Sequence, residues 1–266
     1  MFDNKVLVAV APVDAADTVN NPEEIAADVI KCAEAGAGMV HLHVRDPHGQ
    51  LTENLDHLKK TVDLIRASSD IVIEISTGGV SNLTIEQRCA PLFYDKAEAV
   101  SLNVGSVNLG EAVYQNPIKD VRYCVQKIVE TGKTPEVEVF ELGMIYTTLQ
   151  LAQEFKMKKP LLFSIVLGHI GAAPATIEAL TAMRSFIPSD AVWGITHAHR
   201  VDNDIIQAAI AMGARTVRVG FEDSHYIDRN HVSQTNAPIV KNMVEMLKLM
   251  GKEPMTPSEA RKFLNM

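Results

Sequence analysis

The chain has 266 residues, of which 47% are hydrophobic and 22% are charged, and its formal net charge is −8 at pH 7. This composition excludes a disordered chain, and an acidic chain without a basic run is not expected to bind nucleic acid or an anionic membrane surface. The lack of a signal-peptide pattern and of an apolar run of about 20 residues, together with three scattered cysteines, predicts a reduced, cytoplasmic protein.

The first half of the sequence alternates short β-branched runs with helical patterns. Residues 5–12 (KVLVAVAP) begin the series as a strand, and the pair Asn21-Pro22 marks the start of the helix that follows. The predicted strands in this half are 5–12, 38–44, 71–76 and 99–103, and the predicted helices are 21–35, 52–68, 84–89 and 117–130.

The second half repeats the same alternation. Its predicted strands are 136–140, 161–167, 191–195 and 216–221, and its predicted helices are 145–155, 174–185, 202–211 and 236–250. A last short helix is predicted at residues 256–263, because Thr256 is followed by proline and, three positions on, by Glu259.

This order of elements predicts the fold. Strict alternation of strands and helices indicates a parallel sheet, and eight such units in about 250 residues favour a closed barrel over an open sheet. A dinucleotide-binding fold or a phosphate loop has no support, since no glycine-rich motif of either kind follows the first strand. We therefore predict one (β/α)8 TIM barrel over residues 1–266, with a short C-terminal helical extension from about residue 255.

One predicted strand, in the stretch MVHLHVRDPHG at residues 39–49, carries two histidines. Because successive side chains of a strand alternate between its faces, His41 and His43 point the same way and their aliphatic neighbours point to the packed side. Taken alone, the pair fits either a metal site or two hydrogen-bonded histidines in a polar pocket. Arg45 and Asp46, which follow, are interpreted as anchors of the next loop.

The active site of a barrel of this type lies at the carboxyl ends of its strands, so polar residues there are the candidates. Glu222, beyond the last strand, lies on the same face as Arg218 by alternation. If Glu222 converges with His41 and His43, two imidazoles and one carboxylate form a three-ligand site with open positions, which suits catalytic zinc or another divalent transition metal. The other polar candidates are Ser76, Thr77, Asn103, Ser106, Glu138, His197, His199 and Asp223.

Several motifs taken together resemble the β-keto acid cleavage enzyme family. They are HLHVRDP, STGG, NVGSVN, PEVEVF and VRVGFED, and the tail TNAPIVKNMVEMLKLMGKEPMTPSEAR is similar as well, so the resemblance covers essentially the whole chain. The resemblance implies a zinc-containing (β/α)8 barrel that forms a homo-oligomer, and we expect a tetramer. It implies a reaction in which a β-keto acid condenses with acetyl-CoA and the adduct is cleaved to acetoacetate and a new acyl-CoA.

The resemblance also implies roles for individual residues. His41, His43 and Glu222 would bind the metal, and Asp223 with Arg218 would form a catalytic dyad. A metal on the keto oxygen acidifies the neighbouring CH2 group, and a carboxylate within hydrogen-bonding reach can then take its proton. The residues expected to line the substrate site, from the motifs and the strand ends together, are Ser76, Thr77, Asn103, Ser106, Glu138 and Asp14.

Parts of the site stay open at this point. In the family, an acidic residue of the loop after the first strand recognises a substrate amino group, and both Asp14 and Asp17 are candidates here. The side chain of the keto acid is therefore not assigned. Gly78 and Gly79 fit either a turn or a cradle for CoA phosphates. Two other functions also remain: a metal-dependent aldolase or lyase that acts on a keto or hydroxy acid without a CoA acceptor, and a barrel that binds a keto acid without catalysis.

Overall fold

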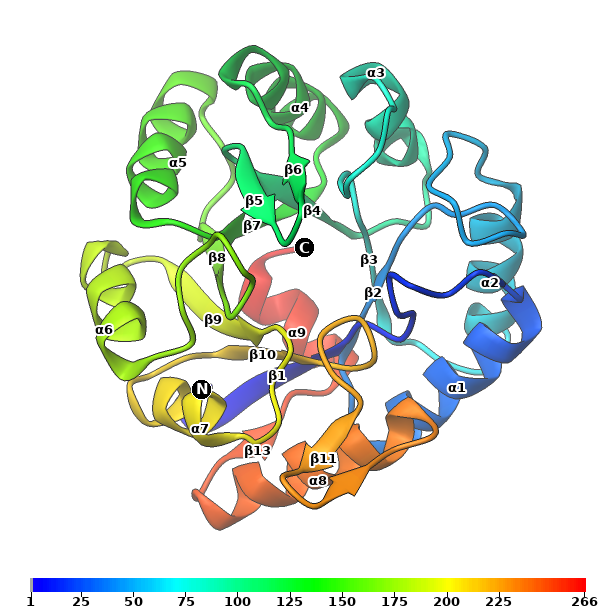
Figure 1. Ribbon diagram of the computed structural model, residues 1–266, viewed down its shortest axis with the longest axis vertical. Coiled ribbons are helices and arrows are strands. Elements are labelled where there is room, and N and C mark those ends of the chain that lie inside the picture. Colours follow the sequence, from blue (N-terminus) through cyan, green and yellow to red (C-terminus); the bar gives the residue numbers. More distant parts are fainter. Residues whose placement is uncertain (1) are drawn as a thin grey trace.

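The computed structural model describes residues 2–266, and its centre is a closed barrel of parallel strands surrounded by helices (Figure 1). Each barrel strand pairs with the next one along the chain, and β10 pairs with β1 to close the ring. The prediction of a (β/α)8 barrel is confirmed. The barrel strands are β1 (Lys5–Val10), β2 (Met39–Leu42), β3 (Val72–Ile75), β4 (Ala99–Asn103), β7 (Thr134–Val139), β8 (Leu162–Leu167), β9 (Val192–His197) and β10 (Thr216–Val219).

Helices connect the strands and cover the outside of the barrel. None of the helices within residues 2–266 combines the length and apolar character needed to cross a bilayer. The helices are α1 (Pro22–Ala35), α2 (Asp56–Arg66), α3 (Ile85–Arg88), the 3-10 helix η1 (Ala90–Phe93), α4 (Ile118–Thr131), α5 (Leu142–Phe155), α6 (Ile177–Phe186), α7 (Asp204–Ala211), α8 (Asn236–Leu249) and α9 (Pro257–Leu264).

The ends of several helices follow from local sequence. Asn21 caps α1, because its side chain accepts hydrogen bonds from the N–H groups of Glu23 and Glu24. Thr256 and Glu259 form a capping box at the start of α9, with each side chain accepting a hydrogen bond from the backbone N–H of the other. Both starts are those that the sequence predicts.

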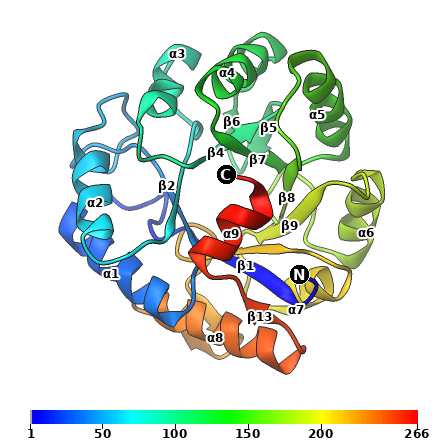
Figure 2. The same ribbon diagram turned by 180° about the vertical axis from the view of Figure 1, so that it is seen from behind.

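The core has an outer and an inner part. Alternate strand residues such as Val40, Ile73 and Val217 point outward and are buried under the helices. A smaller inner cluster, which includes Leu7, Met39 and Leu264 of α9, fills one end of the barrel. Figure 2 shows α9 lying across this end. Helix α9 therefore closes the barrel at the amino ends of the strands.

Two hairpins that the sequence did not predict lie at the opposite end. The first consists of β5 (Val107–Leu109) and β6 (Ala112–Tyr114), which interrupt the connection from β4 to α4 (Figure 1). The second consists of β11 (Tyr226–Asp228) and β12 (His231–Val232). A two-residue strand, β13 (Glu253–Pro254), pairs with the start of β1 on the other side. The carboxyl ends of the strands are thus covered by loops and hairpins rather than by a helix.

Candidate metal and substrate site

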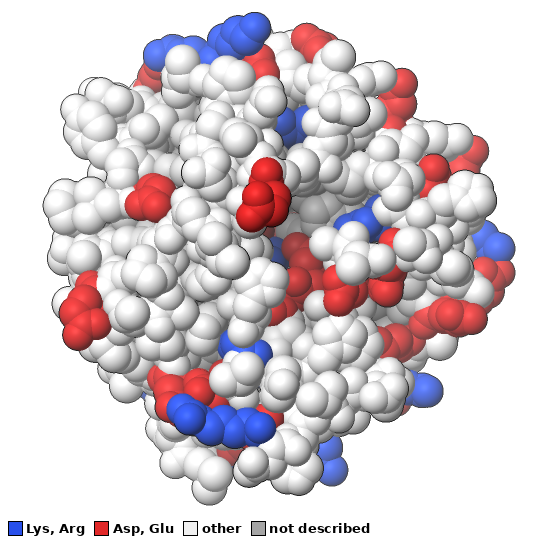
Figure 3. Space-filling model, viewed as in Figure 1, with Lys and Arg blue, Asp and Glu red and all other residues white. Residues whose placement is uncertain are grey.

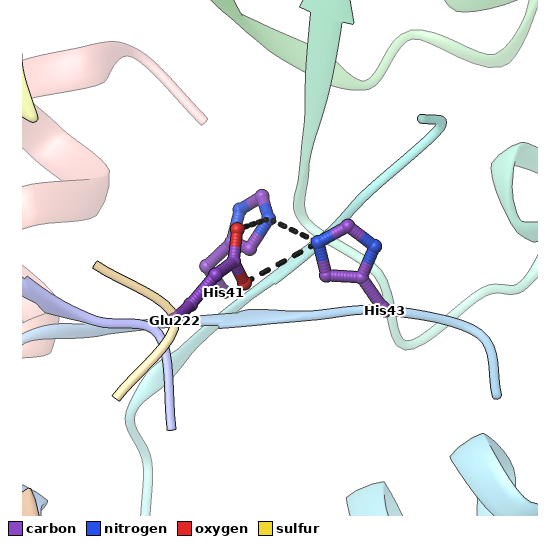
Figure 4. A group of neighbouring side chains, drawn as sticks. All are labelled: His41, His43 and Glu222. Atoms are coloured by element: carbon purple, nitrogen blue, oxygen red, sulfur yellow. Dashed lines mark hydrogen bonds and ion pairs between the residues drawn. The ribbon is translucent and has the colours of Figure 1, made fainter. Parts of the chain in front are cut away.

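His41, His43 and Glu222 meet at the carboxyl end of the barrel (Figure 4). The Nε2 atoms of the two histidines lie 3.4 Å apart, and Nε2 of His43 lies 3.3 Å from a Glu222 carboxylate oxygen. Nε2 of His41 lies 3.9 Å from the other oxygen. His41 is 1% exposed, and ligand atoms of all three residues lie within 4.8 Å of one another. The cluster presents two imidazole nitrogens and a carboxylate to one point.

The backbone explains how these three side chains converge. His41 is on β2 and His43 follows it by two positions, so both point inward. Glu222 reaches them because the chain turns sharply after β10 at Gly220, which has φ +127°. A Cβ atom on Gly220 would lie 2.3 Å from the carbonyl oxygen of Ala11, so only glycine fits this turn.

Glu74 of β3 contacts the His41 ring on the side away from the cluster. Its Oε2 lies 2.9 Å from Nδ1 of His41, and the two residues are paired in register on neighbouring strands. Burial, and then the charge of Glu138, raise the pKa of Glu74 to about 8. When Nδ1 of His41 carries its proton toward Glu74, Nε2 keeps a free lone pair on the side of the cluster. Glu74 therefore fixes the orientation of the His41 ring toward the cluster.

Arg218 joins three carboxylates beside the cluster. Its Nε and Nη2 donate to the two oxygens of Asp223 at 3.0 and 2.7 Å, and its Nη1 donates to Glu138 at 2.8 Å. Nη2 also lies 3.3 Å from Glu222. Burial by itself would lower the pKa of Arg218, but the three carboxylates raise it well above its usual value. Arg218 is a permanent cation that fixes Asp223 in a bidentate pair.

Glu222 is kept in its ionised form by the charged groups around it. Burial would raise its pKa, but the charges of His43, Arg218 and His41 lower it well below its usual value.

On the far side of the network, Nδ2 of Asn103 donates to Glu138 at 2.9 Å. Asn103 therefore acts on the site through Glu138.

These groups open into a cavity of about 510 Å³ at the carboxyl end of the barrel. Figure 3 shows the hollow, with charged side chains in its depth and mainly uncharged side chains on its rim. Such a volume is in the range of small-molecule sites. The charged residues and histidines that line the cavity are His41, His43, Arg45, Glu138, His169, His199, Arg218, Glu222 and Asp223.

Of the other residues expected to line the substrate site, some line the cavity and some do not. Ser76 lines the cavity. Thr77 is buried away from it and donates to the carbonyl of Ser101 at 2.6 Å, and the exposed Ser106 accepts a hydrogen bond from the N–H of Asn116.

The loop after β1 does not turn its acids into the cavity. The Asp14 carboxylate lies 3.0 Å from Nε2 of His225 and accepts a hydrogen bond from the N–H of Ala16, while Ala15 lines the cavity. Asp17 is exposed. The structure therefore brings neither acid of this loop to the cavity wall.

Tyr114 is a cavity residue that sequence reasoning missed. It comes from the β5–β6 hairpin and is 3% exposed, and Arg88 donates to its hydroxyl at 3.3 Å. A Cβ on Gly78 would lie 1.5 Å from this hydroxyl, which explains the glycine there. Gly78 and Gly79 both line the cavity. No sequence signal linked Tyr114 to the site, because the hairpin that carries it was not predicted.

Of the two histidines at and just after the end of β9, His197 and His199, only His199 lines the cavity. Its ring packs edge-on against His169, with centroids 5.1 Å apart, and its N–H donates to the carbonyl of Asp223 at 2.7 Å. Its φ of +57° is unusual for a residue other than glycine. His197 is buried and does not line the cavity. Burial, and then the charge of His199, lower the pKa of His169, so this ring is neutral near pH 7.

Comparison with known proteins adds an independent finding. Residues 11–266 match the family described as beta-keto acid cleavage enzyme. The chain is 33% identical over 246 residues to a 3-keto-5-aminohexanoate cleavage enzyme of Fusobacterium nucleatum subsp. nucleatum, covering 92% of this chain and 89% of the relative. It is 26% identical over 298 residues to a 3,5-dioxohexanoate:acetyl-CoA acetone transferase of Paraburkholderia graminis, covering 98% of this chain and 96% of the relative.

A solved structure gives the same picture of the fold. The chain superposes on ObcA, from a ternary complex with a C4-CoA adduct and oxalate, with a TM-score of 0.80 at 20% sequence identity. The match covers 94% of this chain and 67% of that chain. At this level of identity the likeness supports the barrel fold alone.

Proposed function

This chain belongs to the beta-keto acid cleavage enzyme family, and on that premise we propose that it condenses a β-keto acid with acetyl-CoA and cleaves the adduct to acetoacetate and a new acyl-CoA. One observation carries the proposal: the His41–His43–Glu222 cluster and the Asp223–Arg218 pair face the same cavity. The name of the relative from Paraburkholderia graminis, which includes acetyl-CoA, supports the choice of co-substrate.

We propose that His41, His43 and Glu222 bind zinc or a similar divalent transition metal. Ligands about 2.0–2.1 Å from a tetrahedral ion lie about 3.4 Å from one another. The 3.4 Å between the two Nε2 atoms and the 3.3 Å from His43 to Glu222 fit this spacing. The contact from Glu74 to Nδ1 of His41 is the kind of support that metal-bound histidines receive. The donor set and its surroundings fit the ion.

Asp223 is proposed as the general base. A divalent ion in the cluster would supply Lewis-acid polarisation of the substrate's keto group, which lowers the pKa of the CH2 between the keto carbon and the carboxylate. Asp223 faces the same cavity and takes that proton. Arg218 keeps Asp223 in a fixed orientation through two hydrogen bonds, and Glu138 in turn fixes Arg218.

The remaining steps balance without a redox cofactor. The CH2 carbon, now a carbanion, attacks the thioester carbonyl of acetyl-CoA; a C–C bond forms and the C–S bond breaks, releasing CoA thiolate. The thiolate attacks the original keto carbon, and the bond between that carbon and the former CH2 breaks. The electron pair stays with acetoacetate, which regains its proton from Asp223, and the other fragment leaves as the new acyl-CoA.

Labelled acetyl-CoA tests this proposal directly. Purified protein is mixed with acetyl-CoA labelled with 13C at the carbonyl carbon and with β-keto acids whose far ends carry an ammonium, a carboxylate or a methyl group. The proposed route places the label at carbon 3 of acetoacetate and transfers CoA to the other fragment. Cleavage that proceeds without acetyl-CoA would instead support the aldolase or lyase, and binding without turnover of any keto acid would support the non-catalytic barrel.

Further properties are proposed with the function. Zinc is proposed as the resident ion, and elemental analysis of the purified protein should find about one ion per chain. A homo-oligomer, specifically a tetramer, is proposed from the family resemblance, and its mass by sedimentation tests it. A cytoplasmic location stays a prediction from the sequence.

A further inference from the structure

Arg45 is a buried cation without a carboxylate partner. It is 7% exposed, its Nη1 donates to the carbonyl of Gly49 at 2.6 Å, and its Nε is buried without a partner in the protein. Within residues 2–266, no carboxylate forms an ion pair with it. Asp46, the next residue in the sequence, does not pair with Arg45; its carboxylate accepts hydrogen bonds from the N–H groups of His48 and Gln50.

The contrast with Arg218 is direct. Both arginine residues are 7% exposed and both line the large cavity, but Arg218 is surrounded by three carboxylates. Those same three carboxylates, Glu138, Glu222 and Asp223, are the only acidic side chains on the cavity wall of the described chain. None is left to balance Arg45.

The nearby loop after β1 does not supply the missing charge. Ala15 lines the cavity, but the carboxylate of Asp14 pairs with His225 instead. A cationic substrate group would therefore meet Arg45 without a neutralising acid from this loop. An anionic group would be attracted.

We propose that Arg45 binds an oxyanion of the substrates, carried by a group other than the reacting β-keto acid unit. Burying a guanidinium without a counter-charge costs free energy, and a carboxylate or phosphate brought by a ligand recovers it. The planar guanidinium matches either oxyanion. This inference rests on the proposed function, because it assigns the ligand class of the same cavity.

Two sources can provide the oxyanion. One is a second carboxylate at the far end of the β-keto acid, and the other is a phosphate of CoA. The first predicts a preference for keto diacids, and the second predicts that Arg45 acts on the thioester whatever the keto acid is. The chemistry at Arg45 is the same, so the experiment must separate the sources.

The test is the substrate dependence of Arg45→Gln. Rates are measured with keto acids ending in carboxylate, methyl or ammonium, each with acetyl-CoA and with acetyl-pantetheine, which lacks the nucleotide phosphates. We expect kcat/KM to fall about 10- to 100-fold only where the oxyanion is present, since this is the usual effect of losing a hydrogen bond to a charged group. Arg184→Gln is the matched control: Arg184 also donates to one backbone carbonyl, that of Ile187, but lies on α6 outside the cavity.

The outcomes divide clearly. A loss confined to keto diacids supports the proposal with the keto acid as source, and a loss seen with acetyl-CoA but not with acetyl-pantetheine supports it with CoA as source. An equal loss for every substrate pair, or no loss, overturns it and leaves Arg45 as an anchor of the loop at Gly49. Should Arg45→Gln not fold, Arg45→Lys keeps the charge but not the planar fork, and the same ratios of kcat/KM are measured with it.

Binding separates this proposal from the proposed function. If the wild-type protein turns over no keto acid, calorimetry with glutarate, pentanoate and 3′-phospho-ADP still tests Arg45. Glutarate binding tighter than pentanoate binding, or 3′-phospho-ADP binding, that is lost in Arg45→Gln supports the oxyanion site. Affinities unchanged by the substitution overturn it.

Discussion

The two ends of the barrel interior are built from opposite kinds of side chains, although the same strands supply both. Along β2, Met39 belongs to the apolar cluster at the closed end, and His41, two residues later, lies in the cluster with His43 and Glu222. Along β3, Val72 and Glu74 repeat the change. At the end closed by α9, side chains such as Leu7 belong to an apolar cluster. At the other end, the side chains form hydrogen bonds and ion pairs.

This difference separates stability from chemistry. The apolar end removes surface from water and so contributes to the free energy of folding. The charged end includes the buried carboxyl of Glu74, whose pKa is raised to about 8; ionisation of such a group is costly to folding, and perturbed pKa values of this kind are typical of functional sites. Substitutions at the closed end should change stability with little effect on activity, and substitutions at the open end should do the reverse.

The largest expected effect is the loss of the metal. His41→Ala/His43→Ala removes two of the three proposed ligands, so we expect bound metal and acetoacetate formation to fall below detection. Elemental analysis measures the metal, and an assay of acetoacetate formation measures the activity. His48→Ala/His231→Ala, which changes two exposed histidines, is the control and should keep both. Metal retained by the first double variant would place the ion elsewhere.

The next effect isolates the proposed base. Asp223→Asn should lower kcat about 10²- to 10⁴-fold, the usual contribution of general base catalysis, while keeping the metal because Asp223 is not in the cluster. Exchange of the substrate's CH2 protons with deuterium should be lost as well, and proton NMR follows it. Asp228→Asn, on β11, is the control. Exchange that continues at the wild-type rate would remove Asp223 as the base.

The sequence predicted much of this arrangement because its signals are local. The alternation of strands and helices gave the barrel, and alternation within β2 gave the shared direction of His41 and His43. It did not explain how Glu222 and Asp223 both face the cavity, since neighbours on a strand point to opposite sides. The turn at Gly220 explains it, because the chain has left the strand there.

Other features depend on contacts between distant segments. Glu74 was visible as an acid in an apolar strand, but its role required the register that pairs it with His41. Tyr114 required a hairpin whose short strands carry no clear periodicity. The lack of a carboxylate partner for Arg45 can be seen only when every neighbour is in place. Sequence patterns predict which residue types gather at a strand end, and packing decides which of them face the substrate.

The closed end is tested by Leu264→Ala. Leu264 is 1% exposed and belongs to the inner apolar cluster, so we expect the free energy of unfolding to fall by about 2–5 kcal/mol. Metal content and kcat should stay at wild-type values at a temperature where the variant is folded. Denaturant titration measures the free energy of unfolding, elemental analysis measures the metal content, and an assay of acetoacetate formation measures kcat. Leu249→Ala, at a 90% exposed position, is the control. A parallel fall in kcat of the folded variant would show that the two ends are coupled.

The last expected effect is a dependence of stability on pH, and it concerns Glu136, which lies between the two ends on β7. Burial, and then the charges of Glu74 and Glu138, raise the pKa of Glu136 well above its usual value. The unfolded chain loses this proton above a pH of about 4.3, whereas the folded chain keeps it, so wild-type stability falls by up to about 1.4 kcal/mol per pH unit above that point until the folded pKa is passed.

Glu136→Gln removes this dependence, because glutamine stays neutral in both states. Between pH 5 and pH 8, the unfolding free energy of metal-free Glu136→Gln should therefore fall less steeply than that of metal-free wild type. Denaturant titration at each pH measures the slopes. Glu178→Gln, on the exposed first turn of α6, should keep the wild-type slope. Equal slopes for wild type and Glu136→Gln would mean that Glu136 is ionised in the folded barrel, and that the charged end extends deeper than the carboxylates around Arg218.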